Sequence, residues 1–381
     1  MKIPRFLGSA ALALLPMTGT ALAQDAAAEE LPACENCADS MVIMSWGGAY
    51  QAMQLKAYVQ PYIDATGVSV TWDESSADAV AKLRAMSEAG NVSADVVDAL
   101  GADAIRLCDE GIVQEVPVDE WLAPAPDGTA ASEDLGDNVV SDCHVPTTAY
   151  STTFGYRTDV AEWNGATPDD ICDVFNLEEF PGPRALEQRP IGNLEWALIC
   201  DGVPAEEVYN TLETDEGMAR AFAKLDTIKD SVIWWTAGAE TPQLLADKEV
   251  VIGSTYNGRL FSLIEEQKQP VAMLWDYQIL DIDGFVVPAD LPEDRLNRVK
   301  HFLYFATDTQ RLADQAKYIS YGPMRASSQP LVSTHAELGI EMAPHMPTSP
   351  ENAKNSILFN YDWWADHRDE RDARFHSWLA Q

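Results

Sequence analysis

Short runs of β-branched and apolar residues alternate with helically spaced apolar residues in the first third of the chain. The three runs lie at 41–46, 68–72 and 95–100. The helical segments that follow them end at Gly67, Gly90 and Gly111. This alternation predicts an α/β fold in which helices cover both faces of a parallel sheet. Ligands of such sheets bind beyond the carboxyl ends of the strands, and the first of these ends is at Trp46.

A second α/β pattern occupies the middle of the chain. The Thr- and Tyr-rich run at 144–160 is typical of an extended strand that crosses between two domains. A second crossing is expected in 250–288, where a strand, an Asn257-Gly258 turn and a short helix precede strands at 271–275 and 279–287.

These patterns predict two lobes, each a sheet flanked by helices, joined by crossing strands into a clamshell that closes on a ligand. We expect lobe 1 to comprise 41–150 and 281–330. We expect lobe 2 to comprise 151–280 and 331–381, including C-terminal helices.

The N-terminus has the pattern of a secretory signal peptide. Lys2 and Arg5 precede a short apolar stretch, and Ala21-Leu22-Ala23 forms a small-x-small cleavage site. The apolar stretch is too short for a membrane anchor. We therefore expect a cleaved signal peptide at 1–23, a flexible leader at 24–40 and a periplasmic protein.

Charge and motifs exclude several classes of function. The chain carries 61 acidic and 25 basic residues, for a formal charge of −36, and no Lys/Arg cluster suited to nucleic acid or anionic membranes. It has no hydrolase elbow, zinc-protease motif, phosphate loop or dinucleotide fingerprint, and its histidines lack metal-ligand spacing. We expect no catalytic activity, no cofactor, no metal site and a monomeric protein.

Six cysteines in an exported chain allow disulfides, and the sequence leaves 15 pairings open. We favour Cys108–Cys143 and Cys172–Cys200. The remaining pair, Cys34 and Cys37, has C-x-x-C spacing and is interpreted as a local staple or an exposed pair.

Two acidic residues lie in the last crossing strand. Because strand side chains alternate between faces, Asp281 and Asp283 are expected on the same face, where they repel each other unless a cation lies between them. The alternative for Asp281 is a solvated or salt-bridged strand end.

Four stretches resemble the extracellular solute-binding proteins of ABC importers, and specifically their spermidine/putrescine-binding branch. These stretches are MVIMSWGGAYQ at 41–51, the Tyr256-to-Arg259 turn, LDIDGFVVP at 280–288 and YISYGPMRASS at 318–328. The resemblance implies a type II periplasmic-binding-protein fold, a small amine-bearing ligand and membrane permease subunits as partners.

The resemblance also implies ligand-binding positions. These are Trp46, Tyr50, Glu195, Tyr256, Asp283 and Tyr321. Aromatic faces would hold a polyamine such as putrescine or spermidine, and carboxylates would receive its ammonium groups.

Two residues depart from the polyamine pattern and also count as ligand-binding candidates. Asp281 replaces an aromatic residue, and Arg259 follows the Asn-Gly turn where a small residue is common. An arginine in the cleft would repel a diamine and attract a carboxylate, so the alternative ligand is a zwitterionic ω-amino acid such as γ-aminobutyrate. The competing explanations are core packing for Trp46 and Tyr256, a surface ion pair of Arg259 with Glu265 or Glu266, and a sugar ligand.

Overall fold

A single mixed sheet runs through the part of the chain that the computed structural model describes, residues 31–381. The expected signal peptide and most of the expected leader lie outside these residues. Ten strands pair in the order β2-β1-β3-β8-β4-β7-β5-β6, with β10 added to β8 and β9 to β4. The strands are β1 Ser40–Met44, β2 Ser69–Asp73, β3 Val96–Leu100, β4 Val145–Arg157, β5 Arg184–Glu187, β6 Val232–Trp235, β7 Ile252–Tyr256, β8 Val271–Val286, β9 Gly322–Pro323 and β10 Ile357–Leu358.

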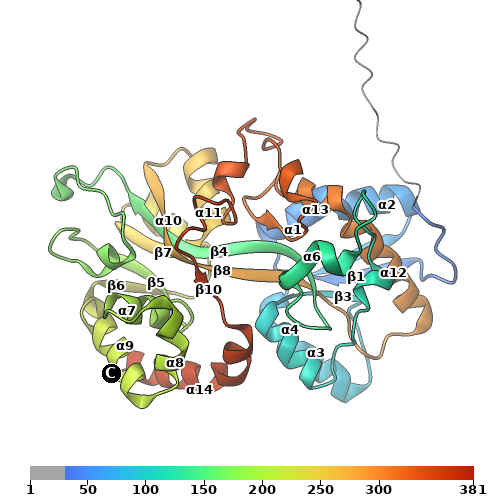
Figure 1. Ribbon diagram of the computed structural model, residues 1–381, viewed down its shortest axis with the longest axis horizontal. Helices are drawn as coiled ribbons and strands as arrows, with labels where there is room; N and C mark the ends of the chain where they lie inside the picture. The colour runs from blue at the N-terminus through green and yellow to red at the C-terminus, as the bar shows by residue number, and fades with distance from the viewer. Residues whose placement is uncertain (1–30) are drawn as a thin grey trace, which may run out of the picture. The chain divides into compact units, whose positions relative to one another are not determined.

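The sheet has a parallel part at each end and an antiparallel centre. At one end β1 pairs in parallel with β2 and β3, and at the other end β5 pairs in parallel with β6 and β7. Helices flank both parts (Figure 1). The predicted α/β fold is therefore confirmed.

The two long strands at the centre connect these parts. β4 pairs with β8 from Val145 opposite Phe285 to Arg157 opposite Val271. The sequence predicted two strands in this segment, and the structure assigns one strand, β8. Residues 271–274 and 279–285 pair with β4, and an irregularity at 275–278 separates these two stretches, where Tyr277 has a φ of 49°. A further register shift lies between Pro146 and Thr148.

The helices that follow the strands lie where the apolar spacing predicts them. Gly67 and Gly90 end two of them in the left-handed conformation that glycine adopts without a steric penalty. The helices are α1 Gly48–Gln54, α2 Gln60–Thr66, α3 Ala79–Ala89, α4 Gly101–Asp109, α5 Val118–Trp121, α6 Ala131–Leu135, α7 Asn193–Cys200, α8 Val208–Leu212, α9 Asp215–Asp226, α10 Glu240–Ala246, α11 Asn257–Phe261, α12 Glu293–Ala306, α13 Thr309–Gln315 and α14 Tyr361–Leu379. A π-helical turn, Leu55–Val59, joins α1 to α2.

The largest apolar core lies around α7, α9 and α14. Trp196 on α7 packs against Phe154 of β4, with ring centroids 4.7 Å apart. Trp378 on α14 stacks on Phe222 of α9 at 5.3 Å. The C-terminal helix therefore contributes aromatic side chains to a shared core.

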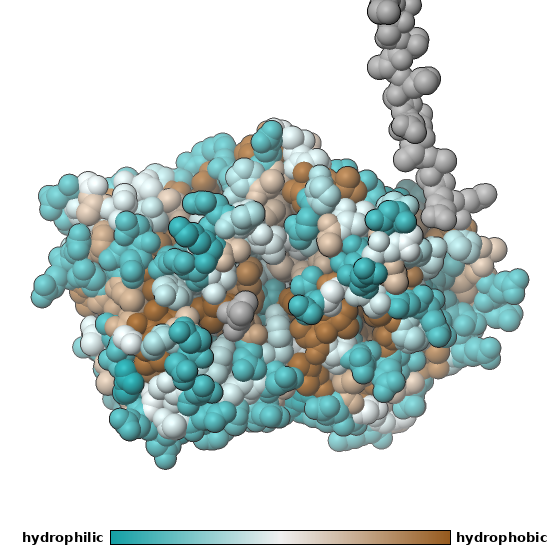
Figure 2. Space-filling view, viewed as in Figure 1, coloured by the Kyte–Doolittle hydropathy of each residue, from teal (hydrophilic) through white to brown (hydrophobic). Residues whose placement is uncertain are grey.

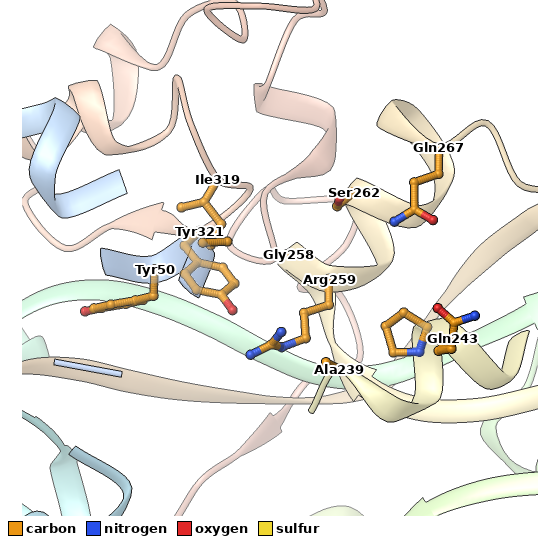
Figure 3. A pocket seen from close by; sticks show the side chains of 11 residues that line it. Tyr50, Ala239, Gln243, Gly258, Arg259, Ser262, Gln267, Ile319 and Tyr321 are labelled. Atoms are coloured by element: carbon orange, nitrogen blue, oxygen red, sulfur yellow. The ribbon is translucent and has the colours of Figure 1, made fainter. Parts of the chain in front are cut away.

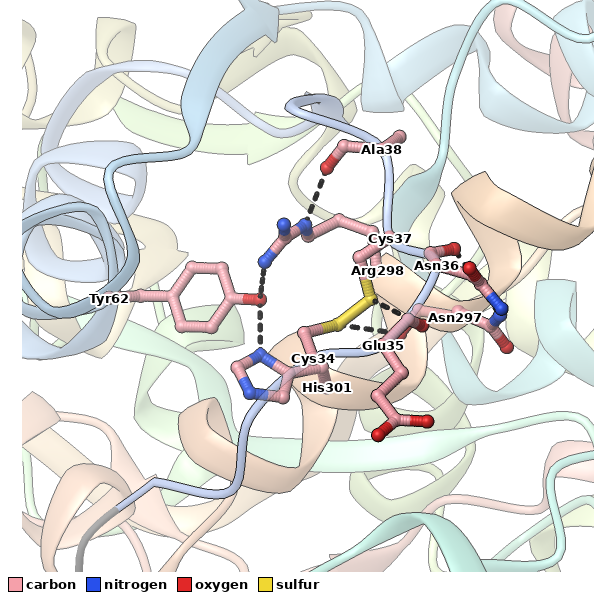
Figure 4. Close-up of a disulfide and its surroundings, with 9 residues drawn as sticks. All are labelled: Cys34, Glu35, Asn36, Cys37, Ala38, Tyr62, Asn297, Arg298 and His301. Atoms are coloured by element: carbon pink, nitrogen blue, oxygen red, sulfur yellow. Dashed lines mark hydrogen bonds between the residues drawn. A yellow bond between two sulfur atoms is a disulfide. The ribbon is translucent and has the colours of Figure 1, made fainter.

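All six cysteines form disulfides. The favoured pairs Cys108–Cys143 and Cys172–Cys200 are confirmed, and Cys34 pairs with Cys37. Beside the Cys34–Cys37 loop, Arg298 of α12 donates to the Ala38 carbonyl at 2.7 Å (Figure 4). The end of the expected leader is thus bound to α12.

Hydrophilic residues cover most of the face shown in Figure 2, as the acidic composition predicts. Within residues 31–381, no helix combines the length and the apolar character needed to cross a bilayer.

Candidate functional site

A cavity of about 220 Å³ lies between the helix that follows β1 and the turn that follows β7 (Figure 3). Its walls combine tyrosine rings with one arginine and small polar side chains. The lining residues are Ala49, Tyr50, Ala239, Pro242, Gln243, Gly258, Arg259, Ser262, Gln267, Ile319 and Tyr321. Three predicted site residues, Tyr50, Arg259 and Tyr321, therefore share one cavity.

Four tyrosine rings form a continuous series beside this cavity. The ring centroids of Tyr50 and Tyr321 are 6.3 Å apart, and those of Tyr321 and Tyr150 are 5.9 Å apart. Tyr150 contacts Tyr256 edge-on at 5.7 Å. Such rings offer π faces to a methylene chain and to a cationic group.

Asp283 supplies a buried carboxyl group next to the tyrosines. It lies in β8 opposite Leu100 of β3 and is 3% exposed. Its Oδ1 has no hydrogen-bond partner within the described residues. Burial raises the pKa of the Asp283 carboxyl well above its usual range, and the neighbouring charges of Asp98 and Asp281 add to the rise. A cation placed here would relieve an electrostatic penalty that the fold leaves unbalanced.

Trp46 lies on the same side of the site. It directly follows β1, is half-buried, and its indole opposes the rise in the pKa of Asp283. The Trp46 Nε1 nevertheless has no hydrogen-bond partner with normal geometry in the described chain. The Trp46 indole N–H therefore lies near the buried acid, and its role in ligand binding stays a prediction.

Asp281 shares a strand face with Asp283, because the pairing of β8 with β4 is regular between the two residues. Asp281 is 6% exposed and accepts a hydrogen bond from the Tyr150 hydroxyl at 2.9 Å. Burial raises the pKa of its carboxyl to about 6. The alternative of a solvated or salt-bridged strand end for Asp281 is therefore wrong.

Arg259 supplies the positive charge of the cavity. It projects from α11, its guanidinium lies 5.9 Å from the centroid of the Tyr256 ring, and Figure 3 shows it extending toward the tyrosines. The expected alternative of an ion pair with Glu265 or Glu266 is wrong. Glu265 pairs with Lys268, and Glu266 accepts a hydrogen bond from Ser262.

Glu195 does not belong to this group, and the prediction that it binds ligand is not supported by its surroundings. It is fully buried at the start of α7, where Oε2 accepts the Gly192 backbone N–H at 2.8 Å and Oε1 accepts the Trp364 indole N–H at 2.9 Å. Burial raises the pKa of the Glu195 carboxyl to about 7. These contacts give the residue a capping and packing role between α7 and α14.

We expect Glu195→Gln to lower the free energy of unfolding by about 1–3 kcal/mol, because the amide oxygen can accept one of the two buried N–H groups and the NH₂ group, a donor, leaves the other without an acceptor. Thermal and urea unfolding would measure the loss. Glu206→Gln, an exposed change in the same region, is the control and should leave stability unaltered. Equal stability of the two variants would contradict this role of Glu195.

Three residues of the site are missing from the sequence prediction. These are Asp98, Tyr150 and Arg189. Asp98 is an acid within an apolar strand, which was a usable signal. Arg189 follows the unpredicted strand β5, and its pKa is raised mainly by Glu187 and also by Tyr256, Tyr150 and Asp281, against the opposing effect of burial. Nothing in its local sequence indicates that position.

Comparison with known proteins adds three findings. Residues 57–348 match the family model described as bacterial extracellular solute-binding protein. A γ-aminobutyric acid-binding protein from Pseudomonas aeruginosa is 34% identical over 343 residues, which cover 90% of this chain and 91% of that protein.

Two solved structures are similar to this chain over most of its length. A GABA receptor is 30% identical, with a TM-score of 0.75 and coverage of 90% of this chain and 98% of the other. The binding protein MotA from Agrobacterium tumefaciens, in complex with glucopine, is 26% identical, with a TM-score of 0.76 and coverage of 89% and 99%. The chain, whose sheet is crossed by β4 and β8, therefore belongs to the bacterial extracellular solute-binding proteins.

Proposed function

We propose that this protein captures a zwitterionic ω-amino acid such as γ-aminobutyrate in the cavity and presents it to the permease subunits of an ABC importer. The observation that carries the proposal is the arrangement of charge around Tyr321. Burial raises the pKa of the Tyr321 hydroxyl. The charge of Arg259 lowers this pKa, and the charge of Asp283 raises it. The Tyr321 ring therefore lies near both the Arg259 guanidinium and the buried carboxyl of Asp283.

This arrangement complements a molecule with separated charges. The carboxylate of the ligand would pair with Arg259, its ammonium group would meet Asp283, and the methylene chain would lie along the Tyr50 and Tyr321 rings. Both charges of the protein would then gain a partner of opposite sign.

A polyamine fits the site less well. It would satisfy Asp283, but its second ammonium group would face Arg259 and be repelled. The two relatives that bind γ-aminobutyrate, at 34% and 30% identity, support the amino-acid ligand over the polyamine.

We further propose that β4 and β8 act as the hinge between the two lobes expected from the sequence, and that the ligand is trapped when the lobes close. In this account the protein is a periplasmic monomer that binds without catalysis. Limited closure on ligand addition, measured by small-angle X-ray scattering as a decrease in radius of gyration, would support the hinge; an unchanged radius would contradict it.

Isothermal titration calorimetry tests the proposed ligand class. We expect binding of γ-aminobutyrate, and on the order of 100-fold weaker binding of butyrate and of butylamine, each of which lacks one of the two charges. Putrescine and spermidine should bind more weakly than γ-aminobutyrate. Tighter binding of either polyamine, or no heat with γ-aminobutyrate, would contradict the proposal.

A further inference from the structure

A second buried acid, Asp98, lies in β3, the strand next to that of Asp283. Asp98 is fully buried. Leu100, two residues after Asp98, is the residue of β3 that lies opposite Asp283 in β8. The Gln54 amide donates to both Asp98 oxygens, at 2.8 and 2.9 Å. Both acids therefore leave water without gaining a cation.

The groups that face this pair from every neighbouring element are neutral donors, aromatic rings or further acids. These groups are Gln54, Tyr50 and Tyr58 from α1 and its π-helical turn, Ser45 and Trp46 from the end of β1, Thr148 from β4, Asp281 from β8, and Tyr321 from the segment before β9. Within residues 31–381, neither Asp98 nor Asp283 forms an ion pair with a Lys, Arg or His.

Neither buried carboxyl has a cation as a partner, so ionisation of both would carry a large electrostatic penalty. The two groups therefore titrate as a pair. A single proton held between them removes one charge and lets one oxygen donate a hydrogen bond. The unpartnered Asp283 Oδ1 provides room for such a proton.

We propose that Asp98 and Asp283 hold one proton between them in the empty site and that the ammonium group of the ligand displaces it, which makes Asp98 a second selectivity residue for cationic nitrogen. The inference rests on the proposed function, which supplies the ammonium group. The proton leaves to solvent, and the nitrogen keeps its own protons.

The electrostatics of the site agree with this assignment. Burial raises the pKa of the Asp98 carboxyl to about 8, against the hydrogen bonds from Ser45 and Gln54 that lower it. The raised pKa values of both carboxyls favour a protonated pair at neutral pH. A cation at Asp283 would lower the pKa of the pair and release the proton.

The pH dependence of affinity follows from this release. Binding should tighten by up to about tenfold per pH unit as the pH rises toward the pKa of the empty pair, and level off above it. The amine of the ligand stays charged throughout this range, because an alkylammonium titrates near pH ~10.

The first test uses the protein without ligand, so it does not depend on the identity of the ligand. Infrared difference spectra of the wild type between pH 6 and pH 9.5 should show loss of the carbonyl band of a protonated carboxylic acid. The loss should be smaller in Asp98→Asn, while the part that comes from the Glu195 carboxyl, whose pKa burial raises to about 7, should be the same in both proteins. An equal loss in the wild type and in Asp98→Asn would overturn the shared proton.

The second test measures proton release during binding. Titrations of the wild type with γ-aminobutyrate at pH 7, in buffers of different ionisation enthalpy, should give about one proton released per ligand. Asp98→Asn should lower the number and shift the pH profile to lower pH, because the Asp283 carboxyl keeps burial but loses the charge of Asp98 as a cause of its raised pKa. Asp95→Asn is the matched control, because Asp95 is buried directly before β3 but is paired with Arg295 at 2.6 Å; it should keep the release.

The outcomes separate the two proposals. Binding without proton release, in the wild type, overturns the shared proton and leaves the proposed function intact. Absence of binding overturns the proposed function, and the infrared band of the unliganded protein then decides on the proton pair alone.

Discussion

Asp283→Asn should weaken the binding of γ-aminobutyrate on the order of 100-fold. The side chain is 3% exposed, so water cannot replace it as a partner for the ammonium group of the ligand. Removal of one member of a buried, hydrogen-bonded charge pair costs about 2–5 kcal/mol in binding free energy, and each ~1.4 kcal/mol is a factor of ten in Kd. Calorimetric titration at fixed pH would measure the change.

The matched control is Asp276→Asn, on the same strand. Asp276 accepts hydrogen bonds from the Ile171 N–H and from Asn355, away from the residues that line the cavity. It should bind the ligand as the wild type does. A similar loss in both variants would indicate a general effect on β8, and no loss in Asp283→Asn would remove this residue from the site.

Arg259→Gln should change the selectivity of the site. We expect roughly tenfold weaker binding of γ-aminobutyrate, because its carboxylate loses a charge-assisted partner. Putrescine should bind more tightly than it does to the wild type, since the repulsion of its second ammonium group is removed. Competition titrations with both ligands would show the reversal as a change in the ratio of Kd values.

Arg220→Gln provides the control for surface charge, because Arg220 pairs with Asp201 at 2.6 Å and does not line the cavity. It should leave both Kd values unchanged. If Arg259→Gln changes the Kd values of γ-aminobutyrate and putrescine by the same factor, in either direction, a role for this guanidinium in choosing between the two ligands is contradicted.

The fold was largely predictable because its strands and helices differ in apolar period. The alternation in the first third predicts β1, β2 and β3 with their helices, and Gly67 and Gly90 locate two helix ends. β5 escaped prediction because it is short and flanked by polar residues and prolines. The sequence prediction divided β8 in two because its middle is polar, and the structure has an irregularity in its pairing with β4 at the same place.

The site was predictable where a residue occupies a recognisable motif. Tyr50, Arg259 and Tyr321 lie in such motifs and line one cavity. Glu195 illustrates the opposite case. Its place at a helix start is compatible with ligand binding, and only the tertiary contacts with Gly192 and Trp364 assign its oxygens to the fold. Arg189 takes part through burial and tertiary contacts, which no local pattern encodes, whereas Asp98, an acid within an apolar strand, left a signal in the sequence.

The most direct test of the account is a crystal structure of the protein with γ-aminobutyrate. The account predicts the ammonium nitrogen within hydrogen-bond distance of Asp283, the carboxylate against Arg259, and the methylene chain along Tyr50 and Tyr321. A ligand bound elsewhere, or bound with its carboxylate toward Asp283, would contradict it.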